Sequence, residues 1–266
     1  MIYFILLLFI TGLFSGSFLG VVVDRNFRKE SFISGRSYCE FCKHELSWYD
    51  LIPVFSFLFL HGKCRYCRKK LSNFYPLVEL FTGIVFLLAF LVAGDFGFTE
   101  LVLFKARFMV DLIFYIFMFS SFVVIFFSDL KFGIVPDKIV FPAIAVNVAW
   151  LLLNMNILPN HLLTGAGTLL FFVLVSLIFY FFTKKVGFGG GDIKLSFLIG
   201  IFLGFPNVLV ALYAAFLTGA IISIILILWG KKNFSRDSIS FGPFLVTGIF
   251  LSLFFGNIIL KVLFNF

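Results

Sequence analysis

The chain has 266 residues, of which 62% are hydrophobic and 13% charged, and 44 of them are Phe. A soluble domain is about 45–50% apolar and about 25% charged, so this composition excludes that class and indicates a multi-pass membrane protein. The net charge of +8 resembles that of a nucleic-acid binder. Because the basic residues lie at the ends of apolar runs, we attribute the charge to membrane topology and contact with lipid, and we expect no nucleic-acid partner.

Eight apolar runs approach the roughly 20 residues that a helix needs to cross hydrocarbon about 30 Å thick. We therefore expect an all-α polytopic membrane protein with about eight transmembrane helices, at 2–23, 76–94, 109–127, 136–155, 162–182, 193–205, 207–229 and 242–264. The first run has no preceding Lys or Arg and no small-residue cleavage site after it, so we expect it to remain as a helix. The run 193–205 is short, and re-entrant insertion is the alternative for it.

The basic residues orient the predicted helices. Eighteen of the 21 Lys and Arg residues fall in four segments, which are 25–70, 131–138, 184–194 and 231–236. Lys and Arg collect in cytoplasmic loops, and eight alternating spans place these four segments on one side. We expect both termini outside and one large cytoplasmic loop after the first span.

That predicted loop contains all four cysteines. Cys39 and Cys42 form one Cys-x-x-Cys pair, and Cys64 and Cys67 form a second after 21 intervening residues. Two such pairs are typical of a zinc ribbon, because four thiolates complete a tetrahedral shell. Disulfides are the alternative, but they seldom persist in the reducing cytosol. We expect a small zinc-ribbon-like domain with the metal as a structural staple and with His44 outside the ligand set.

A glycine cluster ending in an acid separates two apolar runs and reads Gly187-Phe188-Gly189-Gly190-Gly191-Asp192-Ile193-Lys194. A charged side chain at membrane depth costs roughly 2.5–3.5 kcal/mol, so Asp192 is a candidate functional residue. The glycines leave backbone uncovered. Gly189, Gly190, Gly191 and Lys194 form the predicted loop along which a substrate approaches. The structural alternative for Asp192 is an N-cap of a helix beginning at Ile193.

Two carboxyl groups that share a proton can act as general acid and general base without a nucleophilic side chain or a metal, so Asp192 would need a second acid nearby to do such chemistry. Asp129 and Asp137, at predicted cytoplasmic span ends, are the candidates for the second carboxyl group. Asp137 follows Pro136 in the first turn of a span, where the helix dipole favours an anion without any chemical role. Asp129 ends a span, where the dipole disfavours a carboxylate, so we select it. A helix C-terminus disfavours a carboxylate and a helix N-terminus favours one. We therefore predict that Asp129, at a C-terminus, carries the shared proton and that Asp192, at an N-terminus, activates water.

Further motifs follow one another along the chain: 12–19 (GLFSGSFL), 48–50 (WYD) with 52–53 (IP), 75–80 (YPLVEL), 135–137 (VPD) and 240–244 (SFGPF). This ordered series occurs together with Asp129, the cysteine pairs and the segment 189–194 (GGGDIK), which we call the glycine box. The whole set resembles the type IV prepilin peptidases over nearly the whole chain. Gly20, Glu40 and Val186 depart from the family pattern, and none of them is a predicted proteolytic acid.

The resemblance implies a bifunctional enzyme of the bacterial cytoplasmic membrane whose active site faces the cytoplasm. Family members are aspartic endopeptidases that cut the short basic leader of type IV prepilin or pseudopilin precursors after a Gly. They then methylate the new N-terminal residue, usually Phe, from S-adenosylmethionine. Pili, type II secretion and competence systems use such precursors. The resemblance also selects Asp129 and places methyl transfer near the zinc loop and Glu79, for which a favourable first-turn acid is the alternative role.

The expected domain organisation is a first transmembrane helix at 1–23, a zinc-binding loop at 24–75 within a methyltransferase region of about 9–94, a peptidase domain at 105–230, and a last segment, 231–266, of loop and helix. Two other functions stay open. A transporter with a zinc-ribbon loop would place polar residues at span centres, which are nearly bare of charge. A membrane aspartyl peptidase without methyltransferase activity would not need the zinc loop. Small residues are expected to let helices approach at Gly165, Ala166, Gly167, Gly200, Gly204 and Gly219.

Overall fold

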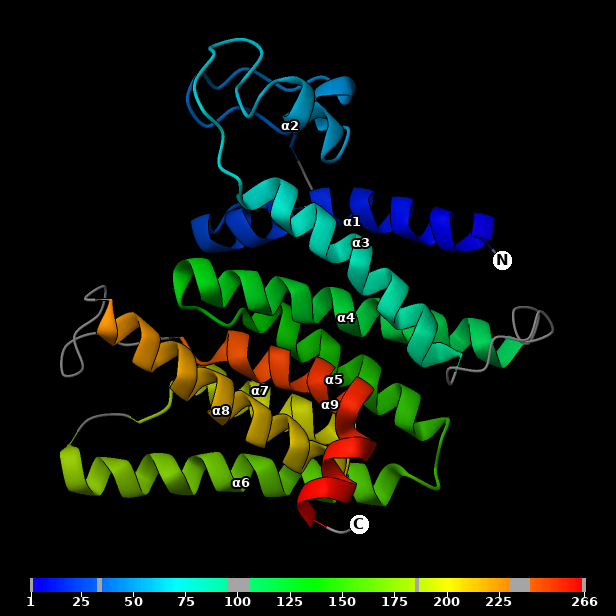
Figure 1. The fold of residues 1–266 in the computed structure, drawn as a ribbon, viewed down its shortest axis with the longest axis vertical. Coiled ribbons are helices and arrows are strands. Elements are labelled where there is room, and N and C mark those ends of the chain that lie inside the picture. Colours follow the sequence, from blue (N-terminus) through cyan, green and yellow to red (C-terminus); the bar gives the residue numbers. More distant parts are fainter. Residues whose placement is uncertain (1, 33–34, 95–105, 185–186, 230–239, 265–266) are drawn as a thin grey trace. The chain divides into compact units, whose positions relative to one another are not determined.

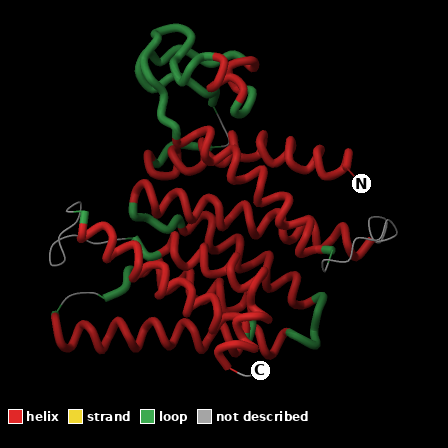
Figure 2. The backbone as a smooth tube through the Cα atoms, viewed as in Figure 1, coloured by secondary structure: helices red, strands yellow, loops and turns green. Residues whose placement is uncertain are grey.

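The computed structural model shows a helical protein (Figure 1) and describes residues 2–32, 35–94, 106–184, 187–229 and 240–264. The chain divides into two compact units, Met1–Phe127 and Ser128–Phe266. Figure 2 shows helices joined by loops. In the described ranges the only strand-like pairings are two isolated bridges, Tyr38↔Glu45 and Lys63↔Lys70. The predicted all-α fold class is confirmed.

Small residues bring the first two long helices of unit 1 together. α1 (Ile2–Arg28) carries Gly12 and Gly16 one turn apart, facing α3 (Phe74–Ala93). A Cβ atom at Gly16 would lie 2.6 Å from the Cα of Glu79, and one at Gly12 would lie 2.8 Å from the Cα of Gly83. Small residues spaced in this way allow close backbone approach between membrane helices. The close packing of α1 on α3 therefore fixes Glu79 against α1.

The loop between α1 and α3 contains little regular structure. It holds the 3₁₀ turn η1 (Trp48–Leu51) and the short helix α2 (Phe55–Phe59). Its compactness comes from turns around the two cysteine pairs. Unit 1 also contains the part of α4 (Ala106–Phe132) up to Phe127, where the Phe81 ring of α3 stacks on Phe126 at 5.6 Å.

Unit 2 is built around α7 (Gly190–Leu203), which packs against the four other helices α5 (Asp137–Leu152), α6 (Leu158–Thr183), α8 (Asn207–Leu228) and α9 (Gly242–Phe264). Leu195, Leu198 and Ile199 of α7 are fully buried. A Cβ atom at Gly200 would lie 2.7 Å from the Cα of Gly165 on α6. The predicted role in close helix approach is therefore confirmed for Gly165 and Gly200, whereas a Cβ atom at Gly167 would meet no atom within 4 Å.

Six helices of the described chain are long and apolar enough to cross a membrane, namely α1, α3, α4, α6, α8 and α9. α5 and α7 have 16 and 14 residues, or about 24 and 21 Å at 1.5 Å per residue, and are shorter than a hydrocarbon layer of about 30 Å. A helix occupies each of the eight predicted runs, but eight crossings are not confirmed. α7 ends where Gly204 adopts a φ of +66°, a conformation that glycine adopts readily.

The close packing of α1 on α3 predicts that Gly16→Ala destabilises unit 1 whereas Gly20→Ala does not. A Cβ atom at Gly20 would make only an ordinary contact, 3.4 Å from the Tyr75 ring. Both changes gain the same helix propensity, so their difference isolates the clash at Gly16, which we expect to cost about 1–3 kcal/mol. Thermal unfolding of the detergent-solubilised protein measures this difference, and equal midpoints for the two variants would contradict the described packing.

Candidate active site

Asp129 lies in the last turn of α4 and is only 5% exposed. Its Oδ2 accepts a hydrogen bond of 2.8 Å from the backbone N–H of Gly242. Gly242 is the first residue of α9, and the first N–H groups of a helix have no partner inside the helix. The N-terminus of α9 therefore supplies the buried carboxylate with a hydrogen-bond donor and with the positive end of a helix dipole.

Glycine is required at position 242 by space. A Cβ atom there would lie 2.5 Å from Asp129 Oδ2 and 3.1 Å from its Cγ. Any other residue would displace the carboxylate or move the start of α9. Sequence reasoning noted residues 240–244 as a motif but gave them no role, because their contact with Asp129 spans more than a hundred residues.

Asp192 lies in the first turn of α7, which begins at Gly190 with Gly189 as its N-cap. The helix thus starts three residues earlier than expected, and Asp192 is a residue of the first turn, not the N-cap. Its backbone N–H donates to the Gly189 oxygen at 3.0 Å. A Cβ atom at Gly191 would lie 2.9 Å from Val135 Cβ, so this glycine lets α7 begin against the connection between α4 and α5.

The structure brings Asp129 and Asp192 together within unit 2. The two carboxyl groups are close enough to interact electrostatically. They come from α4 and α7, and α9 supplies the donor to Asp129. The sequence predicted that the two acids come together, but it gave no indication that α9 contributes to the site.

Asp137 and Lys194 form a separate ion pair. Lys194 Nζ donates to Asp137 Oδ1 at 2.7 Å, and the two side chains are 40% and 55% exposed. Asp137 is the first residue of α5, with Pro136 as the N-cap and not at the first helical position. Lys194, which is part of the predicted loop along which a substrate approaches, therefore has a structural contact with Asp137.

The predicted division of roles between Asp129 and Asp192 loses its physical basis. It rested on the C-terminus of α4, where a carboxylate is disfavoured. The Gly242 N–H and the N-terminus of α9 act in the opposite direction on the same carboxylate. The Asp129 carboxylate thus contacts the N-terminus of α9, and Asp192 lies in the first turn of α7, so dipole arguments no longer separate the two acids.

Phe188, the residue before the glycine box, packs against other aromatic rings. Phe188 lies with its ring 4.9 Å from that of Phe172 on α6 and 5.5 Å from that of Phe241. Phe241 immediately precedes Gly242. The cluster therefore joins the segments that carry Asp192 and the donor to Asp129, which composition alone did not indicate among 44 Phe residues.

The four cysteines form a candidate metal centre. One ligand atom from each of Cys39, Cys42, Cys64 and Cys67 lies within 4.8 Å of the others, and all four are free thiols. Zinc–sulfur bonds of about 2.3 Å in a tetrahedral site require such a cluster. The donor set therefore fits a zinc ion. The ring of His44 instead packs on Tyr66 at 3.7 Å between ring centres.

The two cysteine pairs have matching backbone geometry. Lys43 and Arg68, each directly after a pair, both have a φ of 58°. Their N–H groups donate to the Cys39 and Cys64 oxygens at 2.9 and 3.0 Å. Burial opposes ionisation of the Cys39 thiol, but hydrogen bonds from the backbone of Cys42 and Phe41 outweigh it and lower the Cys39 pKa to about 7. A backbone hydrogen bond from Lys69 favours the Cys67 thiolate, but burial and hydrogen bonds to the other three cysteines outweigh it and raise the Cys67 pKa to about 11. Cys39 is therefore the thiol of these two that ionises more readily, and thiolates are the form that binds metal.

Glu79 is buried on α3, with 7% of its surface exposed. α3 begins at Phe74 and has no acid in its first turn, so the alternative role as a first-turn acid is wrong. Its Oε2 accepts a hydrogen bond of 2.7 Å from the Val54 N–H, and the Ser17 side chain is a second hydrogen-bond partner. Glu79 therefore links α1, α3 and the cysteine-containing loop.

Comparison with known proteins gives two family models and a set of relatives. The bacterial peptidase A24 N-terminal domain matches residues 10–93, and the type IV leader peptidase family matches residues 116–224. A prepilin leader peptidase/N-methyltransferase of Bacillus subtilis is 32% identical over 256 residues, which cover 96% of this chain and 96% of that protein. The chain belongs to the type IV leader peptidase family.

Other relatives of this leader peptidase carry the same description. One from Pseudomonas aeruginosa is 30% identical and covers 99% of this chain and 94% of its own length. One from Myxococcus xanthus is 34% identical over 85% of this chain and 64% of its own length. No solved structure matches the chain. The resemblance inferred from the ordered motifs is therefore confirmed.

The contact between Gly242 and Asp129 predicts that Gly242→Ala lowers the rate of peptide-bond cleavage. The new methyl group displaces a carboxylate whose position matters, and a misplacement of about 1 Å can cost about 100-fold in rate. Gly219→Ala is the control, because its Cβ atom would lie 3.4 Å from the Phe244 ring, an ordinary contact. Cleavage is measured together with the thermal midpoint of each variant. Equal cleavage by the two variants would contradict the proposed requirement for glycine.

Proposed function

We propose that this protein is a bifunctional prepilin peptidase. As an aspartic endopeptidase it cleaves the basic leader of type IV prepilin or pseudopilin precursors after a Gly. As an N-methyltransferase it then methylates the new N-terminal residue from S-adenosylmethionine. Family membership supports both activities. The observation that carries the peptidase assignment is the approach of Asp129 and Asp192 from helices distant in sequence.

Asp129 and Asp192 are the proposed catalytic pair, holding one proton between two carboxyl groups. The protonated carboxyl group donates a hydrogen bond to the oxygen of the scissile carbonyl. The ionised one takes a proton from a water molecule, whose oxygen attacks the carbonyl carbon. The tetrahedral intermediate then re-forms its C=O bond as the C–N bond breaks, and the carboxyl group that took the proton from water gives it to the leaving amine, which returns the pair to its starting state. The proton is assigned to the pair and not to one residue, because interacting carboxyl groups titrate together.

The substrate is proposed to approach along the glycine box. A Cβ atom at Gly190 would meet no atom within 4 Å, and one at Gly189 would lie 3.6 Å from Asp192 Oδ2. Bare backbone therefore borders one of the two acids, where an extended peptide can come close. Lys194 is removed from this proposal, because it pairs with Asp137.

The metal is proposed to be zinc with a structural role. The four cysteine ligands would complete its coordination and leave no open position for catalysis. A loop with one 3₁₀ turn and one five-residue helix buries too little surface to hold its shape alone. The ion would supply the cross-link between the two cysteine turns.

The catalytic pair is proposed to face the cytoplasm. Lys131, Lys138 and Lys184 flank the ends of α4, α5 and α6 nearest the two acids, and basic residues near span ends favour the cytoplasmic side. In this orientation both termini lie outside. The leader of a precursor, being basic, also stays on the cytoplasmic side while its apolar helix remains in the membrane.

The catalytic assignment predicts opposite outcomes for two isosteric changes. Asp192→Asn removes one carboxyl group of the pair and should abolish leader cleavage, whereas Asp137→Asn breaks an exposed ion pair worth less than about 1 kcal/mol and should leave cleavage near normal. Purified protein is incubated with a prepilin and S-adenosylmethionine, and the product N-terminus is read by mass spectrometry. Cleavage by Asp192→Asn at the normal rate, or its loss in Asp137→Asn alone, would refute the assignment.

The metal assignment predicts about one zinc ion per chain in protein purified without chelators. Cys64→Ser should lose the metal and unfold the loop, because a metal-stapled segment is unstable without its ion. His44→Gln is the matched control and should keep the metal. Elemental analysis gives the metal content, and limited proteolysis of residues 35–73 reports the fold of the loop. Loss of zinc from both variants would mean that the ligand set is wrong.

A further inference from the structure

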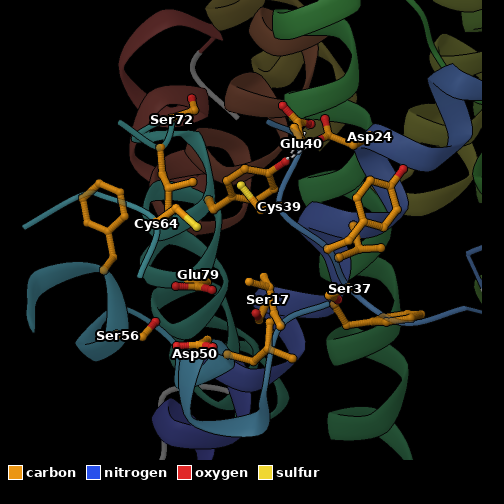
Figure 3. A pocket seen from close by; sticks show the side chains of 18 of the residues that line it. Ser17, Asp24, Ser37, Cys39, Glu40, Asp50, Ser56, Cys64, Ser72 and Glu79 are labelled. Carbon is orange, nitrogen blue, oxygen red and sulfur yellow. Dashed lines mark hydrogen bonds between the residues drawn. The ribbon is translucent and has the colours of Figure 1, made fainter. Parts of the chain in front are cut away.

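The cysteine-containing loop lies against the sides of α1 and α3 and not only beyond their ends. A cavity of about 570 Å³ separates it from the two helices, and Figure 3 labels Ser17 of α1, Glu79 of α3 and Ser56 of α2 in its lining. On α1 the lining runs from Phe14 to Arg28, a length of about 21 Å at 1.5 Å per residue. Because α1 and α3 are long and apolar enough to cross a membrane, part of the loop lies at the level of the bilayer surface.

Two hydrogen bonds set the level of the segment 48–59 along α3. Tyr75, in the first turn of α3, donates from its hydroxyl group to Asp24 Oδ2 on α1. Glu79 lies one turn further along α3, and its Oε2 accepts the Val54 N–H at 2.7 Å. The 20 residues of α3 extend about 30 Å, which matches the hydrocarbon layer. Val54 therefore lies about 7.5 Å inside the start of α3, within the depth of about 5–10 Å at which amphipathic segments lie in a membrane surface.

A strained turn directs Val54 at Glu79. Val54 has a φ of 61° and a ψ of −49°, which is uncommon for a β-branched residue. The Phe55 N–H donates to the Pro53 oxygen at 2.6 Å, so these residues form a tight three-residue turn. A strained backbone persists where the surroundings enforce it. The contact with Glu79 thus holds η1 and α2, which lie on either side of this turn, beside α3.

The rings of α2 divide between its two faces. Phe57 faces the cavity, and a Cβ atom at Gly62 would lie 3.0 Å from its ring. Three large apolar side chains of α2 and three of η1, which contacts α2, are exposed instead. We call them the apolar patch: Trp48, Tyr49, Leu51, Phe55, Leu58 and Phe59. Trp48 and Phe59 are 78% and 79% exposed, and so large an apolar surface on one short segment indicates an interaction site.

The charge beside the apolar patch is positive. The chain has no Asp or Glu from residue 51 to residue 78. Five exposed basic residues follow α2 in this stretch, namely Lys63, Arg65, Arg68, Lys69 and Lys70. Basic residues next to apolar ones bind anionic lipid surfaces, and Trp and Tyr are enriched at the level of the headgroups. A basic peptide would be repelled by the same charge, so lipid is the better match.

We propose that the apolar patch inserts into the anionic membrane surface beside α3 and that the five basic residues contact lipid phosphates. The patch is then an interfacial anchor that holds the cysteine-containing loop on the bilayer. This role is separate from the peptidase and methyltransferase activities proposed above. It requires only that α1 and α3 cross the membrane, because the hydrogen bond to Glu79 then brings the patch to the lipid.

Trp48 itself reports the position of the patch. Trp150→Phe and Trp229→Phe leave it as the only Trp of the chain. The full chain carrying these two changes is placed in nanodiscs of phosphatidylcholine and phosphatidylglycerol. Its fluorescence is then quenched either by acrylamide in the water or by lipid brominated on the acyl chains. We expect strong quenching by the brominated lipid and protection from acrylamide. Quenching by acrylamide alone would overturn the proposal, as would protection that appears only after a prepilin is added.

A pair of variants in the same background tests whether the patch itself places Trp48 in lipid. Leu58→Ser combined with Phe59→Ser should abolish quenching by the brominated lipid and expose Trp48 to acrylamide. Phe41→Ser is the matched control, because Phe41 is also an exposed ring of the loop but lies under the Lys69 ammonium group of the other cysteine turn. Limited proteolysis checks that the loop stays folded in each variant. Equal loss of quenching in the patch variant and the control would contradict the proposed anchor.

The contact with lipid phosphates is tested by changing the lipid charge. Nanodiscs of phosphatidylcholine alone should give weaker quenching of Trp48 by brominated lipid than nanodiscs that contain phosphatidylglycerol. Added salt should reduce this difference, because the Debye length falls to about 3 Å at about 1 M salt. Equal quenching in the two kinds of nanodisc at low salt would contradict the assigned role of the basic residues.

Discussion

The hydrogen bond from the Gly242 N–H to the Asp129 carboxylate is the contact on which the proposed peptidase site depends. A charged group in an apolar helix bundle needs compensation, since its transfer from water is costly. The start of α9 provides it with a backbone donor and a dipole. Asp192 has a comparable position in the first turn of α7. The proposed site therefore forms where the C-terminus of α4 and the N-termini of α7 and α9 come together. The glycines at 189–191 and 242 leave space for the two carboxyl groups.

The two candidate sites lie in different units of the chain. Unit 2 contains the two acids, and unit 1 contains the cysteine cluster and the cavity beside Glu79. The matched family models end at residues 93 and 224, yet α9 lies beyond both and contributes the donor to Asp129. The last helix, which the predicted domain boundaries separated from the peptidase domain, therefore belongs to the proposed site.

Sequence patterns predicted the features that depend on local spacing and composition. The eight apolar runs gave the helices, and two Cys-x-x-Cys pairs gave the metal cluster. The long-range contacts were harder, because residue type alone does not show which helix ends meet. The opposing effect of α9 on Asp129 and the contact of Lys194 with Asp137 were both missed for this reason. The predicted run 193–205 was already short, and α7 is indeed a 14-residue helix with a largely buried second half, which need not match the thickness of the lipid.

Glu79 shows how a local pattern can mislead. The predicted span 76–94 placed it in the first turn of a helix. The helix starts at Phe74, and close packing through Gly12 and Gly16 buries the side chain against α1. The strained turn at Val54 then fixes its carboxylate. None of these three effects is visible in the residues next to Glu79.

The central claim is that Asp129 and Asp192 act as one catalytic unit, and a double-mutant cycle tests it most directly. Leader cleavage is measured for Asp129→Asn, Asp192→Asn and the double variant under single-turnover conditions. Residues that act as a unit have strongly non-additive effects, so we expect each single change to lower the rate about as far as the double change does. Rate losses that multiply in the double variant would show that the two acids act independently and would contradict the account.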